Sequence, residues 1–156
     1  MNGTSYSSSG LGPLFAVMGI IYLAFLIFYL FVAWKLYVKM GEPGWKSLIP
    51  FYNLYIWYQK ILGNGLWIFV LLVPFINVVL MTFIKGFISL LIGILVFIFM
   101  FFFNIVTIFR TAKSFGRGVG TAIGLFFLSG IFYPILALGS AEYNELPAWD
   151  IKDPFN

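Results

Sequence analysis

Few side chains in this 156-residue chain could do chemistry. It contains no cysteine and no histidine, which excludes thiolate nucleophiles, Cys/His metal sites and the commonest general acid–base group. Lys113 and Ser114 suggest a serine–lysine dyad, but neighbours on a helix point about 100° apart and a nucleophile needs its base within hydrogen-bond reach. We therefore expect no enzyme, no metal site and no cofactor.

A second candidate site is the glycine-rich run Gly-Arg-Gly-Val-Gly at residues 116–120. The run lacks the Gly-Lys-Ser/Thr ending with which a phosphate loop holds phosphate and magnesium. Gly116, Gly120 and Gly124 instead recur every four residues, a small-residue stripe that lets two membrane helices approach closely. We expect these glycines to pack helices within the chain or between chains.

The unit Pro-Phe-x-Asn occurs twice, at Pro50 to Asn53 and at Pro74 to Asn77. Each proline interrupts an apolar stretch, and the asparagine amide can bond the carbonyls that the proline leaves free. The repeated unit predicts two helix breaks made in the same way. Alternatively, it indicates a pair of broken helices around a midplane site, as in transporters built from repeats.

Positive charges border the apolar stretches rather than forming one basic surface. The net charge is +4, and the cations are too few and too scattered to predict a nucleic-acid partner. Basic residues at membrane borders set orientation or attract anionic lipid head groups. The residues to which we assign this role are Lys35, Lys39, Arg110, Lys113 and Arg117.

The elements that position these residues are membrane helices. Of the chain, 62% is hydrophobic and 9% is charged, against about 25% charged in a soluble domain. A crossing helix needs about 20 mostly apolar residues, and the runs lack the alternation of barrel strands. We predict an all-α integral membrane protein with about four transmembrane helices, near residues 13–37, 66–84, 86–109 and 119–138.

Residues 41–63 differ from these helices. They are rich in aromatic residues, broken by Pro50 and flanked by Lys46 and Lys60, which favours an interfacial or re-entrant segment. The alternative is a short, kinked crossing by residues 46–62. We expect a flexible N-terminal tail at residues 1–12, a membrane domain at 13–140 and an acidic C-terminal tail at 141–156.

The distribution of cations predicts the orientation. With four crossings and both termini outside, the cations between Lys35 and Lys60 and those between Arg110 and Arg117 lie on the cytoplasmic side. Lys85 then lies in a tight outer connection, where its side chain reaches the interface. The alternative for Lys85 is a lysine at depth within one long helix, where an ionisable residue marks a functional path.

An ordered set of short motifs runs through most of residues 34–143. The motifs are Trp34 to Tyr37, Gly44-Trp45, Ile49 to Asn53, Val73 to Asn77, Ala112 to Gly116 and Phe132 to Gly139. On these motifs the chain resembles a family of small, uncharacterised bacterial membrane proteins, and the same domain is similar to the membrane region that precedes the catalytic domain in some type I signal peptidases. This resemblance implies a multi-pass protein of the bacterial cytoplasmic membrane, without an assigned activity and near protein export.

Two functions fit these observations. The first is an accessory or structural membrane subunit that lies in the lipid bilayer and packs with a membrane-protein partner or with its own copies. It is favoured by the missing catalytic chemistry, the glycine stripe and the short loops. The alternative is a small transporter or channel built on the paired Pro-Phe-x-Asn breaks.

Overall fold

A computed structural model describes residues 11–151 of the protein, and its regular elements are helices. Three segments are long and apolar enough to cross a bilayer: Gly12–Lys39, Gly65–Phe83 and Phe87–Ser114. These three confirm the predicted all-α fold and indicate a multi-pass membrane protein. The elements are α1 (Leu11–Lys39), η2 (Gly44–Leu48), α2 (Tyr52–Leu62), η3 (Gly65–Leu71), α3 (Leu72–Phe83), α4 (Phe87–Ser114), α5 (Val119–Phe127) and α6 (Ser129–Leu138), where η denotes a 3-10 helix.

The predicted crossing at 119–138 does not form one continuous helix. The backbone leaves the helical region at Leu128 (φ −131°, ψ 44°) and divides this run into α5, of 9 residues, and α6, of 10. Each is shorter than a crossing helix. The run also begins and ends at one place, because Arg117 and Ser140 lie 3.5 Å apart between Nη2 and Oγ. Helices α5 and α6 therefore form a short hairpin.

The sequence of α6 leaves one of its backbone carbonyls without a donor from its own helix. Pro134 lies inside α6 and has no N–H to give to the carbonyl of Gly130, four residues earlier. The hydroxyl of Tyr29, on α1, donates to that carbonyl over 2.6 Å. Ser129 and Gly130 are also weak helix formers, which accounts for a break beside them. Residues 119–138 are uncharged and numerous enough for a crossing helix, so charge and length did not indicate the break at Leu128.

Residues 41–63 form a second short hairpin. Glu42 contacts Lys46 at 2.7 Å and Lys60 at 3.4 Å, so the segment returns to the place where it started and does not cross. The chain turns between η2 and α2 around Pro50, and the turn places Phe51 at a positive φ of 64°. The two hairpins pack together, and the rings of Trp57 and Tyr133 lie 5.8 Å apart.

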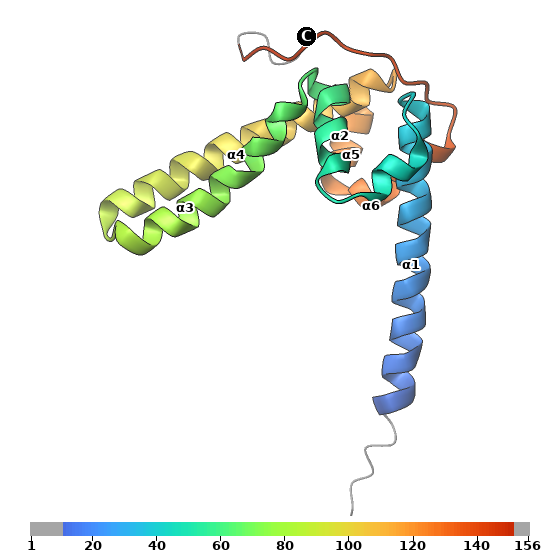
Figure 1. Ribbon diagram of the computed structural model, residues 1–156, viewed down its shortest axis with the longest axis horizontal. Coiled ribbons are helices and arrows are strands. Elements are labelled where there is room, and N and C mark those ends of the chain that lie inside the picture. The colour runs from blue at the N-terminus through green and yellow to red at the C-terminus, as the bar shows by residue number, and fades with distance from the viewer. Residues whose placement is uncertain (1–10, 152–156) are drawn as a thin grey trace, which may run out of the picture.

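The long helices diverge from this compact part (Figure 1). The backbone of α1 lies close to η2 and α6, and its Tyr37 hydroxyl donates to the Asn53 carbonyl of α2, whereas α3 pairs with α4 and η3. The buried apolar clusters lie where both hairpins meet the ends of α1 and α4. Lys85 lies in the turn between α3 and α4, next to Gly86 with φ 88°. The alternative of one long helix through Lys85 is therefore wrong.

Hydrogen bonds from Lys39 fix where the chain after α6 lies relative to α1. Lys39, the last residue of α1, donates from Nζ to the carbonyls of Leu136 at 2.7 Å, Gly139 at 2.6 Å and Ala141 at 3.0 Å. The segment after α6 therefore lies at the end of α1 opposite to Leu11. Positions 1–10 of the predicted N-terminal tail lie outside the described residues.

Candidate functional site

Six cations gather at one end of the molecule, which we call the cationic end: Lys39, Lys46, Lys60, Arg110, Lys113 and Arg117. Hydrogen bonds and ion pairs join them there. Lys46 and Lys60 share Glu42, and Lys39 and Arg117 both reach the segment after α6. Arg110 and Lys113 belong to the last turns of α4 at the same end. The cationic end holds both hairpins and the chain that follows them.

Residues 139–151, which we call the C-terminal strap, cross the cationic end in an extended conformation (Figure 1). The amide of Asn144 donates to the Ser114 carbonyl at 2.6 Å, and that of Trp149 donates to the Leu62 carbonyl at 2.7 Å. Trp149 is buried beside Trp67, with ring centroids 4.5 Å apart. The strap is thus part of the packed structure, although its acidic sequence indicated only a tail.

Arg110, near the end of α4, holds the strap through a hydrogen bond. Its side chain is 1% exposed, and its guanidinium donates from Nε to the Ile61 carbonyl at 2.9 Å and from Nη2 to the Pro147 carbonyl. The sequence predicted a role for Arg110 in orientation or head-group binding. These two hydrogen bonds go to backbone carbonyls of α2 and of the strap, and no residue type in the sequence indicates them.

Two titratable groups report on this packing. The Tyr143 hydroxyl donates to the Lys60 carbonyl at 2.7 Å, and burial raises the pKa of Tyr143 to about 12, with a further contribution from nearby Glu145. The hydrogen bond from Lys46 lowers the pKa of Glu42, and Lys60 acts in the same direction. Both groups therefore hold their neutral-pH charge states, with Tyr143 protonated and Glu42 ionised.

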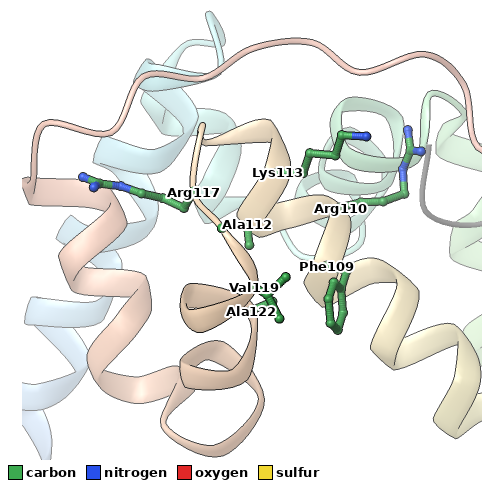
Figure 2. A pocket seen from close by; sticks show the side chains of 8 residues that line it. Phe109, Arg110, Ala112, Lys113, Arg117, Val119 and Ala122 are labelled. Carbon is green, nitrogen blue, oxygen red and sulfur yellow. The ribbon is translucent and has the colours of Figure 1, made fainter.

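A groove lies between the end of α4 and the start of α5. The cavity of this groove that lies nearer the cationic end has a volume of about 590 Å³. Phe109, Val119 and Ala122 line its apolar part, whereas Lys113 and Arg117 extend away from it at the cationic end (Figure 2). A second cavity of about 220 Å³ shares Phe109 and Ala122 with the first. It continues along α4 and α5 among Phe101, Ile105, Ile123, Phe126 and their neighbours.

The three glycines of the predicted stripe have three different environments. Gly116 lies outside α5 and ends α4 with φ 63°, in a C-terminal cap where Arg117 N donates to Ala112 O and Gly116 N donates to Lys113 O. No atom lies within 4 Å of a Cβ placed on Gly120, whereas one on Gly124 would lie 2.2 Å from the Phe132 ring. Close helix approach within the chain is thus seen at Gly124.

The two Pro-Phe-x-Asn units occupy related places. Each follows a 3-10 helix that begins at a glycine, Gly44 or Gly65. A Cβ on Gly44 would lie 2.3 Å from the Trp34 indole, and one on Gly65 would lie 2.4 Å from the Tyr55 ring. The repeated sequence therefore corresponds to a repeated local structure, in which the first glycine of a 3-10 helix lies against an aromatic ring.

The prolines and asparagines of these units differ in their surroundings. Pro50 lies in the turn before α2, whereas Pro74 lies in the first turn of α3, where a missing N–H costs little. Asn53 donates from Nδ2 to the Ser47 carbonyl at 3.1 Å. Asn77 is buried within α3. The two asparagines therefore lie on different helices.

The polar side chains near the groove show what catalysis or metal binding this region could support. The Ser114 hydroxyl is fully buried and donates to the Thr111 carbonyl at 2.9 Å, while neighbouring Lys113 is exposed. Among residues 11–151, no group of three or more His, Cys, Asp or Glu side chains could hold a metal ion. Asn104, by contrast, is exposed on the apolar helix α4. The surrounding chain leaves this amide uncovered.

Comparison with known proteins gives one match. A family model described as "Family of unknown function (DUF5684)" matches residues 45–146, which is more than half of the chain and includes both hairpins, α3, α4 and part of the strap. No curated protein and no solved structure shows a significant match. On the extent of the family match, this chain belongs to the DUF5684 family, a family of unknown function.

Proposed function

We propose that this protein is an accessory or structural membrane subunit that packs against a membrane-protein partner or another copy of itself. The observation that carries the proposal is Asn104, an exposed amide in the otherwise apolar stretch of α4 from Leu90 to Val106. An amide in hydrocarbon leaves its hydrogen bonds unmade, and membrane helices commonly satisfy such a side chain across a helix–helix interface. A second polypeptide at this face would supply the bond.

The arrangement of the long helices supports the same proposal. Most of α1 and of the α3–α4 pair lies outside the buried clusters, and the backbone of α1 does not come close to that of α3 or α4 among the described residues. The two arms diverge from the cationic end (Figure 1). Membrane helices gain stability by packing against one another. Over much of their length, α1 and the α3–α4 pair lack neighbours in their own chain. Their surfaces can therefore pack against a helix of another chain.

We propose a three-crossing orientation for this subunit. Helix α1, the continuous run of η3 and α3 (Gly65–Phe83) and helix α4 cross, and the cationic end faces the cytoplasm, because basic residues favour that side. The start of α1 then lies outside, and the strap lies inside. The bacterial cytoplasmic membrane as its location, and a place near protein export, rest on the resemblance to bacterial membrane proteins and signal peptidases.

The transporter alternative has weaker support. Asn53 lines a cavity of about 230 Å³ with Tyr37, Trp57 and other residues. Asn77 is buried on α3, and Asn104 is exposed on α4. A shared polar path would need these amides to converge, and their positions on three helices give no sign of it. We therefore favour the subunit.

Purification in a mild neutral detergent tests the proposal. The native chain should elute in a particle larger than its own 17.7 kDa plus detergent, with a second protein or more copies of itself. Asn104→Leu should weaken this association. Thr82→Val is the matched control, because Thr82 is also exposed but its hydroxyl donates to the Val78 carbonyl of its own helix at 3.2 Å. A native chain that is strictly monomeric, with no co-purifying protein, would contradict the proposal.

A further inference from the structure

Asn104 lies on a side of α4 that the described residues leave exposed. Phe103, the residue before it, is buried beside Trp67. Phe101, three residues before it, meets the Phe126 ring of α5 with ring centroids 6.0 Å apart. Successive residues of a helix are about 100° apart around its axis, so Asn104 points between these two packed sides of α4.

The position of Asn104 along α4 places its amide in hydrocarbon. Lys113, at the cationic end, follows Asn104 by nine residues, and a helix advances by about 14 Å over that distance. Half of the hydrocarbon core of a bilayer is about 15 Å thick. In the three-crossing orientation the amide therefore lies where water is absent, and it needs a hydrogen-bonding partner that inserts to the same depth.

The chemistry of the amide identifies a partner that the chain itself can supply. A carboxamide has an acceptor oxygen and two N–H donors, so a second carboxamide that faces it can donate and accept at once. Copies of one membrane protein insert in the same direction, because the same basic residues orient each of them. A two-fold axis along the membrane normal then places Asn104 of one copy opposite Asn104 of the other, at equal depth.

We propose that two copies of this chain pair through α4, with the two Asn104 amides hydrogen-bonded to each other across a two-fold axis. This inference rests on the proposed subunit function and names the partner as a second copy. Asn104 is the single polar side chain from Leu90 to Val106, so sliding one helix past the other separates the amides. The pair therefore also fixes the register of the two helices, as a lone asparagine does in a coiled coil.

Single cysteines can report this pairing, because the native chain has none and each disulfide-linked dimer then joins two copies at the introduced residue. We expect N104C to form such a dimer when membranes that contain the full chain are treated with copper phenanthroline, an apolar oxidant. I108C, one turn along on the same side of α4, keeps Asn104 and should also form it. F102C is the matched control, because Phe102 is exposed at nearly the same depth but lies about 160° from Asn104 around the helix.

The contribution of the amide can be measured by energy transfer between donor-labelled and acceptor-labelled copies in lipid vesicles. Both dyes are attached to E142C, since Glu142 is exposed on the strap. N104L should weaken the dimer about fivefold to thirtyfold, which corresponds to about 1–2 kcal/mol for an amide hydrogen bond between membrane helices. N104Q keeps the amide and should lose less, and T82V should leave the dimer unchanged.

The possible failures of this inference and of the subunit proposal can be told apart. If neither N104C nor I108C forms a disulfide-linked dimer while the native chain co-purifies with a different protein, the two-copy inference is overturned and the subunit proposal stands. Equal cross-linking of F102C and N104C, or an N104L dimer as tight as the native one, would also overturn the inference, because the copies then pair elsewhere. A monomeric native chain without any co-purifying protein would contradict both.

Discussion

Lys39, at the end of α1, donates a 2.6 Å hydrogen bond to the carbonyl of Gly139, the residue that follows α6. A cation is well placed there, because the last carbonyls of a helix carry partial negative charge. This contact ties the end of the first crossing to the end of the second hairpin. It requires the chain to enter and leave α5–α6 at the cationic end.

Cysteine labelling should show this topology directly, because the native chain has no cysteine of its own. We expect K113C, before α5, and E142C, after α6, to react with an impermeant thiol reagent from the same side of the membrane. K85C, in the turn between α3 and α4, should react from the opposite side. Labelling of K113C and E142C from opposite sides would restore a crossing by residues 119–138.

Removing the buried charge of Arg110 should loosen the strap. Arg110→Met keeps an apolar side chain but leaves the Ile61 and Pro147 carbonyls without the charged donor. Hydrogen bonds to charged groups contribute about 1.5–3 kcal/mol each. We expect a lower melting temperature in detergent and faster protease cleavage within residues 139–151.

Lys35→Met is the control for that variant, since Lys35 is exposed on α1 and its ammonium lies 5.6 Å from the Phe31 ring. It should change neither the melting temperature nor the cleavage rate appreciably. Equal protease resistance of the strap in Arg110→Met and the native chain would show that Arg110 does not hold it.

Glycine substitutions should distinguish a packed position from an open one. A Cβ at Gly124 would lie 2.2 Å from the Phe132 ring, so Gly124→Ala must displace that ring or push α5 and α6 apart. Overpacking of this kind costs about 1–3 kcal/mol. Gly120→Ala meets no atom within 4 Å and should stabilise α5 slightly through helix propensity. Thermal unfolding of both variants in one detergent measures the difference, and an equal effect would refute the packing role of Gly124.

Alkaline pH should destabilise the cationic end through Tyr143. Burial raises its pKa from the ordinary 10.0 to about 12 in the folded chain. Its contribution is complete below pH 10, where the unfolded tyrosine is also neutral, and is lost as the pH rises towards 12. The melting temperature should fall less steeply over this range in Tyr143→Phe than in the native chain.

Tyr22→Phe serves as the control for this titration, because Tyr22 is 70% exposed on α1. It should keep the steep native dependence. A native slope that survives in Tyr143→Phe would assign the alkaline transition to other groups, such as Tyr58, whose pKa burial also raises.

Part of this structure could be predicted from the sequence. The runs that became α1, α3 and α4 are long, uncharged and apolar, and hydrophobicity alone indicates such helices. The same signal failed at Leu128, because the run stays apolar through the break between α5 and α6. The strap was missed for another reason. The strap is held by backbone hydrogen bonds to Arg110 and to the end of α2. These contacts form only after folding, and residue types do not encode them.

The sequence indicated only part of the groove between α4 and α5. Lys113 and Arg117 stand out as border cations, and a head-group role follows from their charge. Their relation to Phe109 and Ala122 depends on how α5 returns along α4, which the sequence did not indicate. The repeated glycine, aromatic and proline pattern was the clearest local signal, since both copies form a 3-10 helix followed by an α-helix.

The central claim is that the Asn104 face of α4 packs against another polypeptide in the membrane. Its most direct test is a photo-reactive benzophenone side chain at position 104 of the full chain, activated in intact membranes. We predict a protein adduct at this position and only lipid adducts from the same group at Phe83, which is 80% exposed near the turn of the α3–α4 pair. Lipid adducts alone at position 104 would contradict the claim.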